Sequence, residues 1–366
     1  MDSILLLTDG KRVGLAVNQT SILVRTNTHL LDALLAQGTD VKRIFAPEHG
    51  LRGTEDAGAR VKNHLDTPTG IPVISLYGKH FKPTPAELSG LDVIVFDMQD
   101  VGARFYTYIS TMHYLMEACA EQGIAFVVLD RPNPNDYVDG PVRQPGYRSF
   151  VGLHPVPLLH GLTVGELARM INGEGWLQGG RRCALTVVGM KNWRHGVPYR
   201  LPVKPSPNLP NEQAVRLYPS LCLFEGTGVS VGRGTCFPFQ ALGCPNPGAG
   251  EFTFTPVAIA GLDSDPLHRN RVCFGEDLRD CPFRGGLTLQ FLLDFYSRLG
   301  KNGKLFFTRA HWFDLLAGTK ELRIQILSGY TEKEIRAAWQ PDLERYRELR
   351  RNYLLYPDYT AGRDSR

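Results

Sequence analysis

One short segment combines three side chains that could carry out acid–base chemistry. Glu48, His49 and Arg52 lie within five residues, directly after the apolar stretch 41–46. A carboxyl beside an imidazole and a guanidinium can act as a general acid or a nucleophile, because its neighbours tune its pKa. The structural alternative is an ion pair between Glu48 and Arg52 that only fixes a loop. The position after an apolar run favours the chemical interpretation.

A second carboxylate, Glu225, opens a glycine-rich segment that extends to Thr235. Four glycines between residues 226 and 234 would let the backbone approach a ligand closely. The segment matches neither the phosphate-binding P-loop nor the dinucleotide fingerprint, so a phosphate site is a weak interpretation. Two carboxylates from distant segments are what glycoside hydrolysis uses. An ion pair between Glu225 and Arg233 in a hairpin is the structural alternative.

A third polar group follows the apolar run 93–96 and contains acids, an amide, a guanidinium and a phenol. This mixture suits the hydroxyl and amide groups of a sugar. One of the acids, Asp100, could instead cap the helix that follows. The members of the group are Asp97, Gln99, Asp100, Arg104 and Tyr106.

The elements that must position these residues are strands separated by helices. The pattern predicts a long helix at 104–122 and strands at 13–17, 41–46, 71–76, 93–96 and 124–129. The strands are nearly continuous apolar runs, which is typical of parallel strands buried on both faces. Such a pattern predicts a doubly wound, mostly parallel α/β sheet with right-handed crossovers.

In such a sheet the carboxyl ends of the parallel strands lie on one edge, where ligands bind. The polar residues that follow the strands are therefore expected to converge there. They are Asn18, Glu48, His49, Asp97, Asp100, Asp130 and Arg131.

The second half of the chain has a different texture. Prolines are dense between residues 198 and 219, which excludes regular helix or central strand around 205–210. Further helices are expected at 165–172, 287–299 and 332–351, the last interrupted or restarted at Pro341, with a strand at 184–188. We expect a sheet domain over 1–160 and a smaller auxiliary α/β domain over 161–366.

Composition is ordinary for a globular protein, with 43% hydrophobic and 21% charged residues and a net charge of +4. The arginines between 345 and 351 alternate with acids, which favours a solvated helix face over a nucleic-acid contact. Seven cysteines form no CxxC pair, so we expect no zinc site. No apolar run reaches about 18 residues, so we expect no membrane span.

Several motifs together resemble the exo-β-N-acetylmuramidase family typified by NamZ, long catalogued as a domain of unknown function. The resemblance covers residues 13 to about 245. One departure is Pro202-Val203-Lys204, which stands where the family has a tryptophan-containing lead into the proline-rich motif. The matching segments are 17–20, 47–50, 75–78, 95–108, 129–134, 205–210 and 225–235.

The resemblance implies a cofactor-independent and metal-free glycosidase that removes N-acetylmuramic acid (MurNAc) from the non-reducing ends of peptidoglycan fragments. It implies a site in the cleft between a Rossmann-like domain and the auxiliary domain, with Glu48 and Glu225 as catalytic residues. A guanidinium can grip the lactyl carboxylate of MurNAc. The expected substrate-binding residues are Asn18, His49, Arg52, Asp97, Gln99, Asp100, Arg104, Tyr106, Asp130, Arg131, Asn208 and Arg233, with Arg52, Arg104 and Arg233 as the candidates for that grip.

Other interpretations remain open at this point. The main alternative is a non-catalytic muropeptide- or sugar-binding protein; a nucleotide-binding protein is opposed by the missing phosphate fingerprint. Retaining, inverting and substrate-assisted mechanisms are all compatible with the residues. Peptidoglycan substrates suggest a periplasmic or secreted location, although no signal sequence is visible and a cytoplasmic one stays open. The sequence does not predict the oligomeric state.

Overall fold

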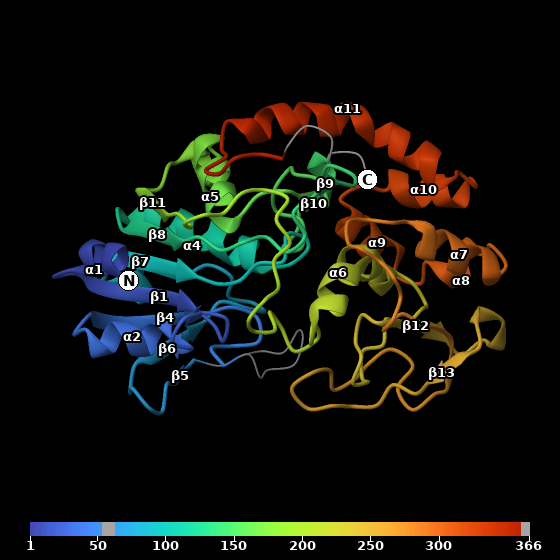
Figure 1. Cartoon of the computed structure of the whole chain (residues 1–366), viewed down its shortest axis with the longest axis horizontal. Coiled ribbons are helices and arrows are strands. Elements are labelled where there is room, and N and C mark those ends of the chain that lie inside the picture. Colours follow the sequence, from blue (N-terminus) through green and yellow to red (C-terminus); the bar gives the residue numbers. More distant parts are fainter. Residues whose placement is uncertain (53–62, 360–366) are drawn as a thin grey trace.

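The computed structural model of the chain describes residues 1–52 and 63–359. One half of the molecule is built on a seven-stranded sheet, and the other half combines helices with a three-stranded sheet (Figure 1). This arrangement confirms the predicted α/β fold class.

The large sheet has the strand order β11-β8-β7-β1-β4-β6-β5. All neighbours pair in parallel except β5, which is antiparallel to β6. Chain order from the central strand runs first to one side and then to the other, as in doubly wound dinucleotide-binding folds. The strands are β1 (Arg12–Val17), β4 (Asp40–Ala46), β5 (His64–Leu65), β6 (Pro72–Ser75), β7 (Val93–Asp97), β8 (Ala125–Leu129) and β11 (Leu185–Val188).

The strands are buried on both faces because their apolar runs are continuous. Every residue of β7 is buried, and so is every residue of β1 after its first. One face packs against α1 (Asp2–Thr8) and α2 (Leu30–Ala36). The other packs against α4 (Tyr108–Gln122) and α5 (Val164–Gly173). The carboxyl ends of the parallel strands point toward the second half of the molecule (Figure 1).

The remaining elements are short or belong to the second half. In the sheet half they are β2 (Ile22–Leu23), β3 (Thr28–His29), α3 (Pro85–Leu88), β9 (Val138–Asp139), η1 (Pro145–Tyr147), β10 (Leu159–His160) and η2 (Gln178–Gly180). In the second half they are α6 (Glu212–Leu221), η3 (Cys222–Gly226), β12 (Ala241–Cys244), η4 (Pro247–Ala249), β13 (Phe252–Phe254), β14 (Cys273–Asp277), α7 (Gln290–Arg298), α8 (Gly303–Phe306), α9 (Ala310–Ala317), α10 (Glu321–Leu327) and α11 (Glu332–Arg351).

The sheet half extends past the boundary that we placed at residue 160. Its edge strand β11 lies at 185–188, and it pairs with β8. The end of the chain also returns to this half, because Tyr356 Oη donates a hydrogen bond to Asp130 Oδ2 (2.6 Å). The two halves are therefore joined twice, by the segment after β11 and by α11.

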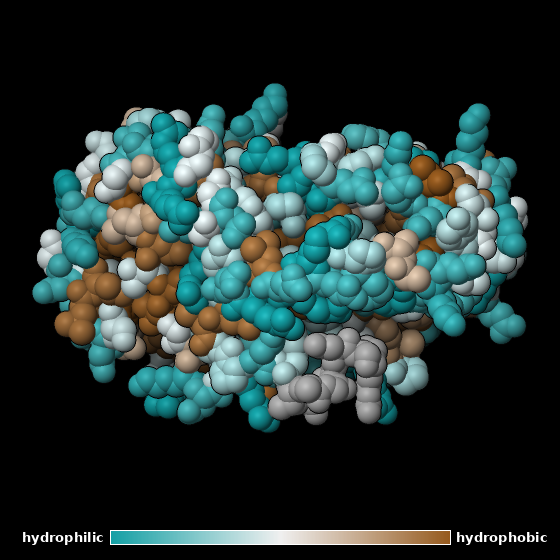
Figure 2. Space-filling model, turned by 90° about the horizontal axis from the view of Figure 1, so that it is seen from above, coloured by the Kyte–Doolittle hydropathy of each residue, from teal (hydrophilic) through white to brown (hydrophobic). Residues whose placement is uncertain are grey.

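Helix α11 bridges the two halves without a break, which corrects the predicted interruption at Pro341 (Figure 1). Both Pro341 and Ala337 lie on the exposed side of the helix, so water can solvate the carbonyl that loses its donor. Figure 2 shows the face that carries α11, and it is largely hydrophilic over this helix. Arg345 and Arg351 are solvated as predicted, but Arg350 is buried and pairs with Asp358 (2.8 Å).

Within the described ranges, no helix combines the length and the apolar character that crossing a bilayer requires.

Candidate active site

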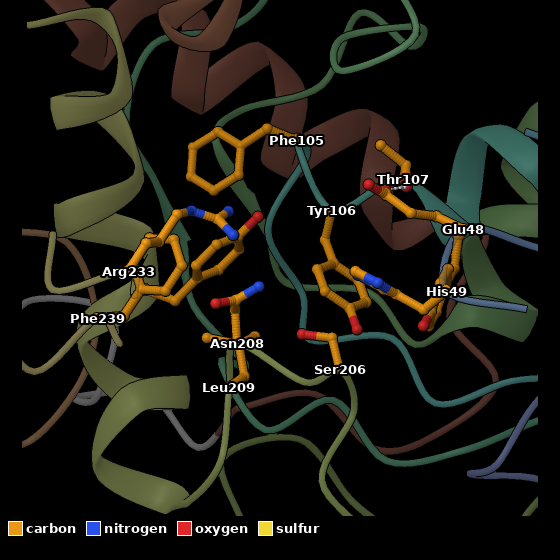
Figure 3. A pocket seen from close by; sticks show the side chains of 12 residues that line it. Glu48, His49, Phe105, Tyr106, Thr107, Ser206, Asn208, Leu209, Arg233 and Phe239 are labelled. Carbon is orange, nitrogen blue, oxygen red and sulfur yellow. Dashed lines mark hydrogen bonds between the residues drawn. The ribbon is translucent and has the colours of Figure 1, made fainter. Parts of the chain in front are cut away.

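Glu48 stands at the carboxyl end of β4, in a turn that fixes its direction. The two residues after it, His49 and Gly50, have φ values of 70° and 73°. A left-handed conformation at a non-glycine residue is uncommon and is held only where the surroundings impose it. Glu48 Oε2 accepts a hydrogen bond from Thr107 Oγ1 (2.9 Å), at the start of α4 (Figure 3). The carboxyl is therefore oriented by an adjacent helix.

Glu48 and Thr107 belong to the wall of a pocket that opens between the two halves. Its empty volume is about 420 Å³, which includes space that is open to solvent. Figure 3 shows Arg233 and Asn208 on one side of this pocket and Glu48 and His49 on the other. The lining residues are Glu48, His49, Phe105, Tyr106, Thr107, Tyr108, Ser206, Asn208, Leu209, Tyr218, Arg233 and Phe239.

The second predicted acid, Glu225, lies in η3 and is paired with Arg233. Arg233 donates from Nε (3.0 Å) and Nη2 (2.7 Å) to Glu225 Oε1, and its guanidinium lies 5.0 Å from the centroid of the Phe239 ring. Burial by itself lowers the pKa of Arg233, but the Glu225 carboxylate more than offsets this and raises it. The ion pair considered as the structural alternative therefore exists, and its arginine lines the pocket.

Tyr77 connects the two acidic groups. It follows β6, and its phenol lies close enough to the Glu48 carboxylate for the two groups to interact. Burial is the largest cause of the raised pKa of Tyr77, followed by the charge of Glu48; Glu225 raises it further and Arg233 lowers it. The Tyr77 hydroxyl is thus a proton donor within electrostatic range of both carboxylates.

The proline-rich segment at 205–210 forms one wall of the pocket. Tyr106 Oη and Tyr108 Oη donate to the carbonyl of Pro205 at 2.9 and 3.1 Å, which places Ser206 and Asn208 beside them. Asn208 Nδ2 donates to Leu262 O (3.0 Å). The predicted ordered loop at 205–210 is therefore a wall of the site.

Two buried polar atoms of the wall have no hydrogen-bond partner among the described residues. They are Arg233 Nη1 and Asn208 Oδ1, one donor and one acceptor. Leaving such atoms unpaired costs about 1–3 kcal/mol each. A ligand that forms hydrogen bonds with both atoms would therefore bind more tightly. Their arrangement suits a ligand that carries a carboxylate and a hydroxyl or amide hydrogen.

The predicted residues at the ends of β7 and β8 do not line this pocket. Arg131 donates to Asp97 from Nε (2.5 Å) and Nη2 (2.9 Å); Asp97 is buried and the Arg131 side chain is 11% exposed. Asp130 accepts from Thr163 Oγ1 (2.7 Å) and Tyr356 Oη, and its burial raises its pKa to about 6. These groups hold the sheet half together.

The ends of β1 and β7 are closed by a buried hydrogen-bond network. Asn18 Oδ1 accepts from Thr20 N (2.9 Å), Thr20 Oγ1 accepts from Gln99 N (2.9 Å), and the Ser21 hydroxyl donates to Asp97 O. This place is the switch point at which nucleotides bind in doubly wound sheets. Asn18 and Gln99 fill it, which opposes the nucleotide-binding alternative.

Three further residues that we predicted to bind substrate have other partners. Arg104 is fully buried and donates to the carbonyls of residues 141, 156 and 316, so it cannot reach substrate; burial lowers its pKa to about 9. Asp100 accepts from Gly102 N (2.7 Å) and does not cap α4, which begins later, at Tyr108. Arg52 pairs with Asp66 (2.9 Å) rather than with Glu48.

Sequence reasoning missed several residues of the pocket. Those beside recognised motifs could have been found, because Thr107 continues the 97–106 group and Tyr77 ends a predicted strand. Tyr218 and Phe239 gave no signal, since a tyrosine in a helix and a phenylalanine in a loop are usually core residues. The missed residues are Tyr77, Phe105, Thr107, Tyr108, Ser206, Leu209, Tyr218 and Phe239.

Over residues 1–52 and 63–359, no group of three or more histidine, cysteine or acidic side chains is arranged to hold a metal ion. The seven cysteines are all free thiols, and most of them are buried.

Comparison with known proteins identifies the chain's relatives. The profile described as "Exo-beta-N-acetylmuramidase NamZ, N-terminal" matches residues 13–213, and its C-terminal counterpart matches residues 216–356. A curated protein of Bacillus subtilis (strain 168), peptidoglycan beta-N-acetylmuramidase NamZ, is 39% identical over 95% of this chain and 87% of its own length.

Two crystal structures of DUF1343 family proteins from Bacteroides fragilis have the same fold. The first is 44% identical, with a TM-score of 0.89 over 98% of this chain and 97% of its own. The second is 32% identical, with a TM-score of 0.83 over 97% and 96%. Both halves of the chain and most of its length are matched, and the chain therefore belongs to the exo-β-N-acetylmuramidase NamZ family.

Proposed function

We propose that the pocket beside Glu48 is the active site with which this chain acts as an exo-β-N-acetylmuramidase on peptidoglycan fragments. The activity follows from its family and from its curated relative. The observation that carries the assignment to this pocket is that Glu48 from the sheet half and Arg233 from the other half line it together. Arg233 is paired with the second carboxyl, Glu225, and both carboxyls act electrostatically on Tyr77.

Substrate recognition in this proposal depends on Arg233. Among the three arginines considered for the lactyl carboxylate, Arg104 is buried under three carbonyls and Arg52 is paired with Asp66. Arg233 lines the pocket, and its Nη1 has no partner in the described part of the chain. Because Nε and Nη2 are held by Glu225, this remaining donor is fixed in direction before substrate binds.

Glu48 and Glu225 are the carboxyls that act on the glycosidic bond. Thr107 holds the Glu48 carboxyl in place by donating to it, and the Tyr77 phenol lies nearby. Arg233 holds the Glu225 carboxyl from the opposite wall. Two carboxyls that face one bound sugar can supply a proton to the leaving oxygen and assist attack at the anomeric carbon. Proton NMR of the first-formed anomer separates inversion from the retaining and substrate-assisted routes.

The test is hydrolysis of a MurNAc 4-nitrophenyl glycoside by Glu48→Gln and Glu225→Gln. Each variant should lose about 10²- to 10⁴-fold in kcat, because a carboxamide neither donates a proton readily nor accepts one. Binding of MurNAc, measured by calorimetry, should persist at least in Glu48→Gln. Glu212→Gln, which changes an exposed acid on α6, is the matched control and should leave kcat unchanged. Full activity in both active-site variants would remove these acids from the mechanism.

The alternative function, a non-catalytic muropeptide- or sugar-binding protein, predicts a different result for the unmodified chain. It would bind MurNAc with the same residues but release no nitrophenol. The periplasmic or secreted location stays a prediction, and cell fractionation tests it.

A further inference from the structure

Three partly exposed aromatic rings form a shelf beside the pocket. Phe81 and Phe150 stack with centroids 4.1 Å apart and planes 25° apart. Tyr114 is nearly parallel to both, at 6.3 Å and 18° from Phe81 and at 6.4 Å and 11° from Phe150. Each ring keeps part of its surface in contact with solvent, and none belongs to the buried cores of the molecule. We call Phe81, Tyr114 and Phe150 the aromatic shelf.

The shelf is continuous with Glu48 through Tyr77. The Tyr77 ring meets Phe150 edge to face, with centroids 6.0 Å apart, and Phe81 at 6.4 Å. The phenol of the same residue interacts with the Glu48 carboxylate. One side chain therefore contacts both the predicted catalytic carboxyl and the shelf.

Helix α4 provides a second connection. Thr107, which donates to Glu48, precedes the helix, and Ser110 and Tyr114 follow at spacings of three and seven residues, so all three lie on one side. Ser110 Oγ donates to the carbonyl of Phe150 (2.7 Å), which attaches the loop of that ring to the helix. Helix α4 therefore fixes the position of the shelf relative to Glu48.

We propose that the aromatic shelf binds the pyranose ring on the leaving-group side of the scissile bond. This inference rests on the proposed function. An exo-acting enzyme takes the terminal sugar into its pocket, so the next sugar lies where the glycosidic bond leaves that pocket. This place is next to an acidic group. Phe81 and Phe150 cover one face of each other, and the aromatic surface that the shelf keeps open to solvent suits the C–H-rich face of a β-linked pyranose.

The experiment compares two substrates that share the terminal sugar. One is a MurNAc-terminated disaccharide with a β-linked N-acetylglucosamine as leaving group. The other is MurNAc β-fluoride, whose leaving group has no ring. Phe150→Leu and Phe81→Leu should each reduce kcat/KM for the disaccharide on the order of tenfold, by loss of one stacking contact. The value for the fluoride should stay within about twofold of the unmodified enzyme.

Three controls keep the result specific. Phe150→Tyr keeps the ring and should retain activity on both substrates. Phe252→Leu removes a partly buried ring from the small sheet, away from the pocket, and should change neither rate. Thermal melting of every variant shows whether the protein is folded.

Each outcome decides the proposal. A loss confined to the disaccharide supports the subsite. Equal losses on both substrates would show that the rings act through Tyr77 and Glu48, and unchanged rates would show that they do not touch the leaving group; either result overturns it. Failure of the proposed function would be seen in the unmodified enzyme, which would then hydrolyse neither substrate.

Discussion

Two regions of the same sheet edge are built alike in sequence and used differently. The ends of β4 and β6 carry Glu48 and Tyr77, which border an open pocket. The ends of β7 and β8 carry Asp97 and Arg131, which are paired and largely buried. All four residues belong to or follow apolar strands. We call the ends of β7 and β8 the covered region, because loops of the sheet half and the segment after α11 lie over them. We call the ends of β4 and β6 the open region, because the second half of the molecule leaves a pocket there.

The covered region should respond to mutation through stability. Asp97→Asn or Arg131→Met should lower the free energy of unfolding by about 3–5 kcal/mol, because each leaves a buried partner unpaired. Urea unfolding measures this change, and kcat/KM per folded molecule should stay within about twofold.

The matched control for this prediction is the exposed ion pair between Arg12 and Asp92. Arg12→Met should cost about 1 kcal/mol or less, because solvent screens exposed pairs. A large loss of activity per folded molecule in Asp97→Asn would contradict the assignment of the covered region to stability alone.

The covered region should also make stability depend on pH through His195. Its buried ring lies between Asp136 (2.9 Å) and Glu166 (3.0 Å). Burial by itself lowers its pKa, but the two carboxylates raise it to about 9. Because the folded pKa exceeds the unfolded value near 6.5, the stabilisation is complete below about pH 6.5 and is lost as pH rises through about 9.

The expected loss for the unmodified chain is on the order of 3 kcal/mol between pH 6.5 and 9.5. Urea unfolding at several pH values measures it, and His195→Gln should show a much flatter dependence. His80→Gln, which changes a more exposed histidine paired with Glu87, is the control. The same slope in His195→Gln as in the unmodified chain would show that other groups cause the dependence.

The open region should respond through catalysis, and Arg233→Lys tests its recognition of the lactyl group. A lysine cannot hold Glu225 with two nitrogens and offer a third to substrate, so kcat/KM for MurNAc glycosides should fall about 10- to 100-fold. Activity on the corresponding N-acetylglucosamine glycoside, however low, should change less. Arg52→Lys should change neither. Equal losses on both glycosides would mean that Arg233 only positions Glu225.

The fold could be predicted further from the sequence than the site could. Continuous apolar runs predicted five strands of the large sheet, since burial on both faces leaves no other pattern. The boundary at residue 160 did not anticipate β11 joining this sheet, because a short strand at the edge has the same local pattern wherever it pairs. Whether α11 continued through Pro341 depended on the exposure of one carbonyl, which the sequence does not specify.

Site residues could be predicted where their type and their position after a strand were enough. They could not be predicted where contacts with distant segments determine whether a side chain reaches the pocket. Glu48, His49, Tyr106, Asn208 and Arg233 were predicted and line the pocket. Arg104 looked equivalent to Arg233 in sequence, but its guanidinium meets carbonyls from segments far along the chain. Its burial therefore depends on tertiary contacts with no local signal. Tyr218 and Phe239 also lacked a local signal. They line the pocket only because the second half of the molecule packs opposite Glu48.

The smallest expected effect tests whether Tyr77 belongs to the open region. Tyr77→Phe removes the hydroxyl that interacts with Glu48 and keeps the ring that meets Phe150. We expect kcat to fall about 3- to 10-fold, about the contribution of one hydrogen bond formed in the transition state, with KM little changed and the pH profile of kcat displaced. Tyr330→Phe removes the hydroxyl of an exposed tyrosine between α10 and α11 and should leave both constants unchanged. A silent Tyr77→Phe would limit the machinery of the open region to its carboxyls, since the phenol would then only fill space between Glu48 and the shelf.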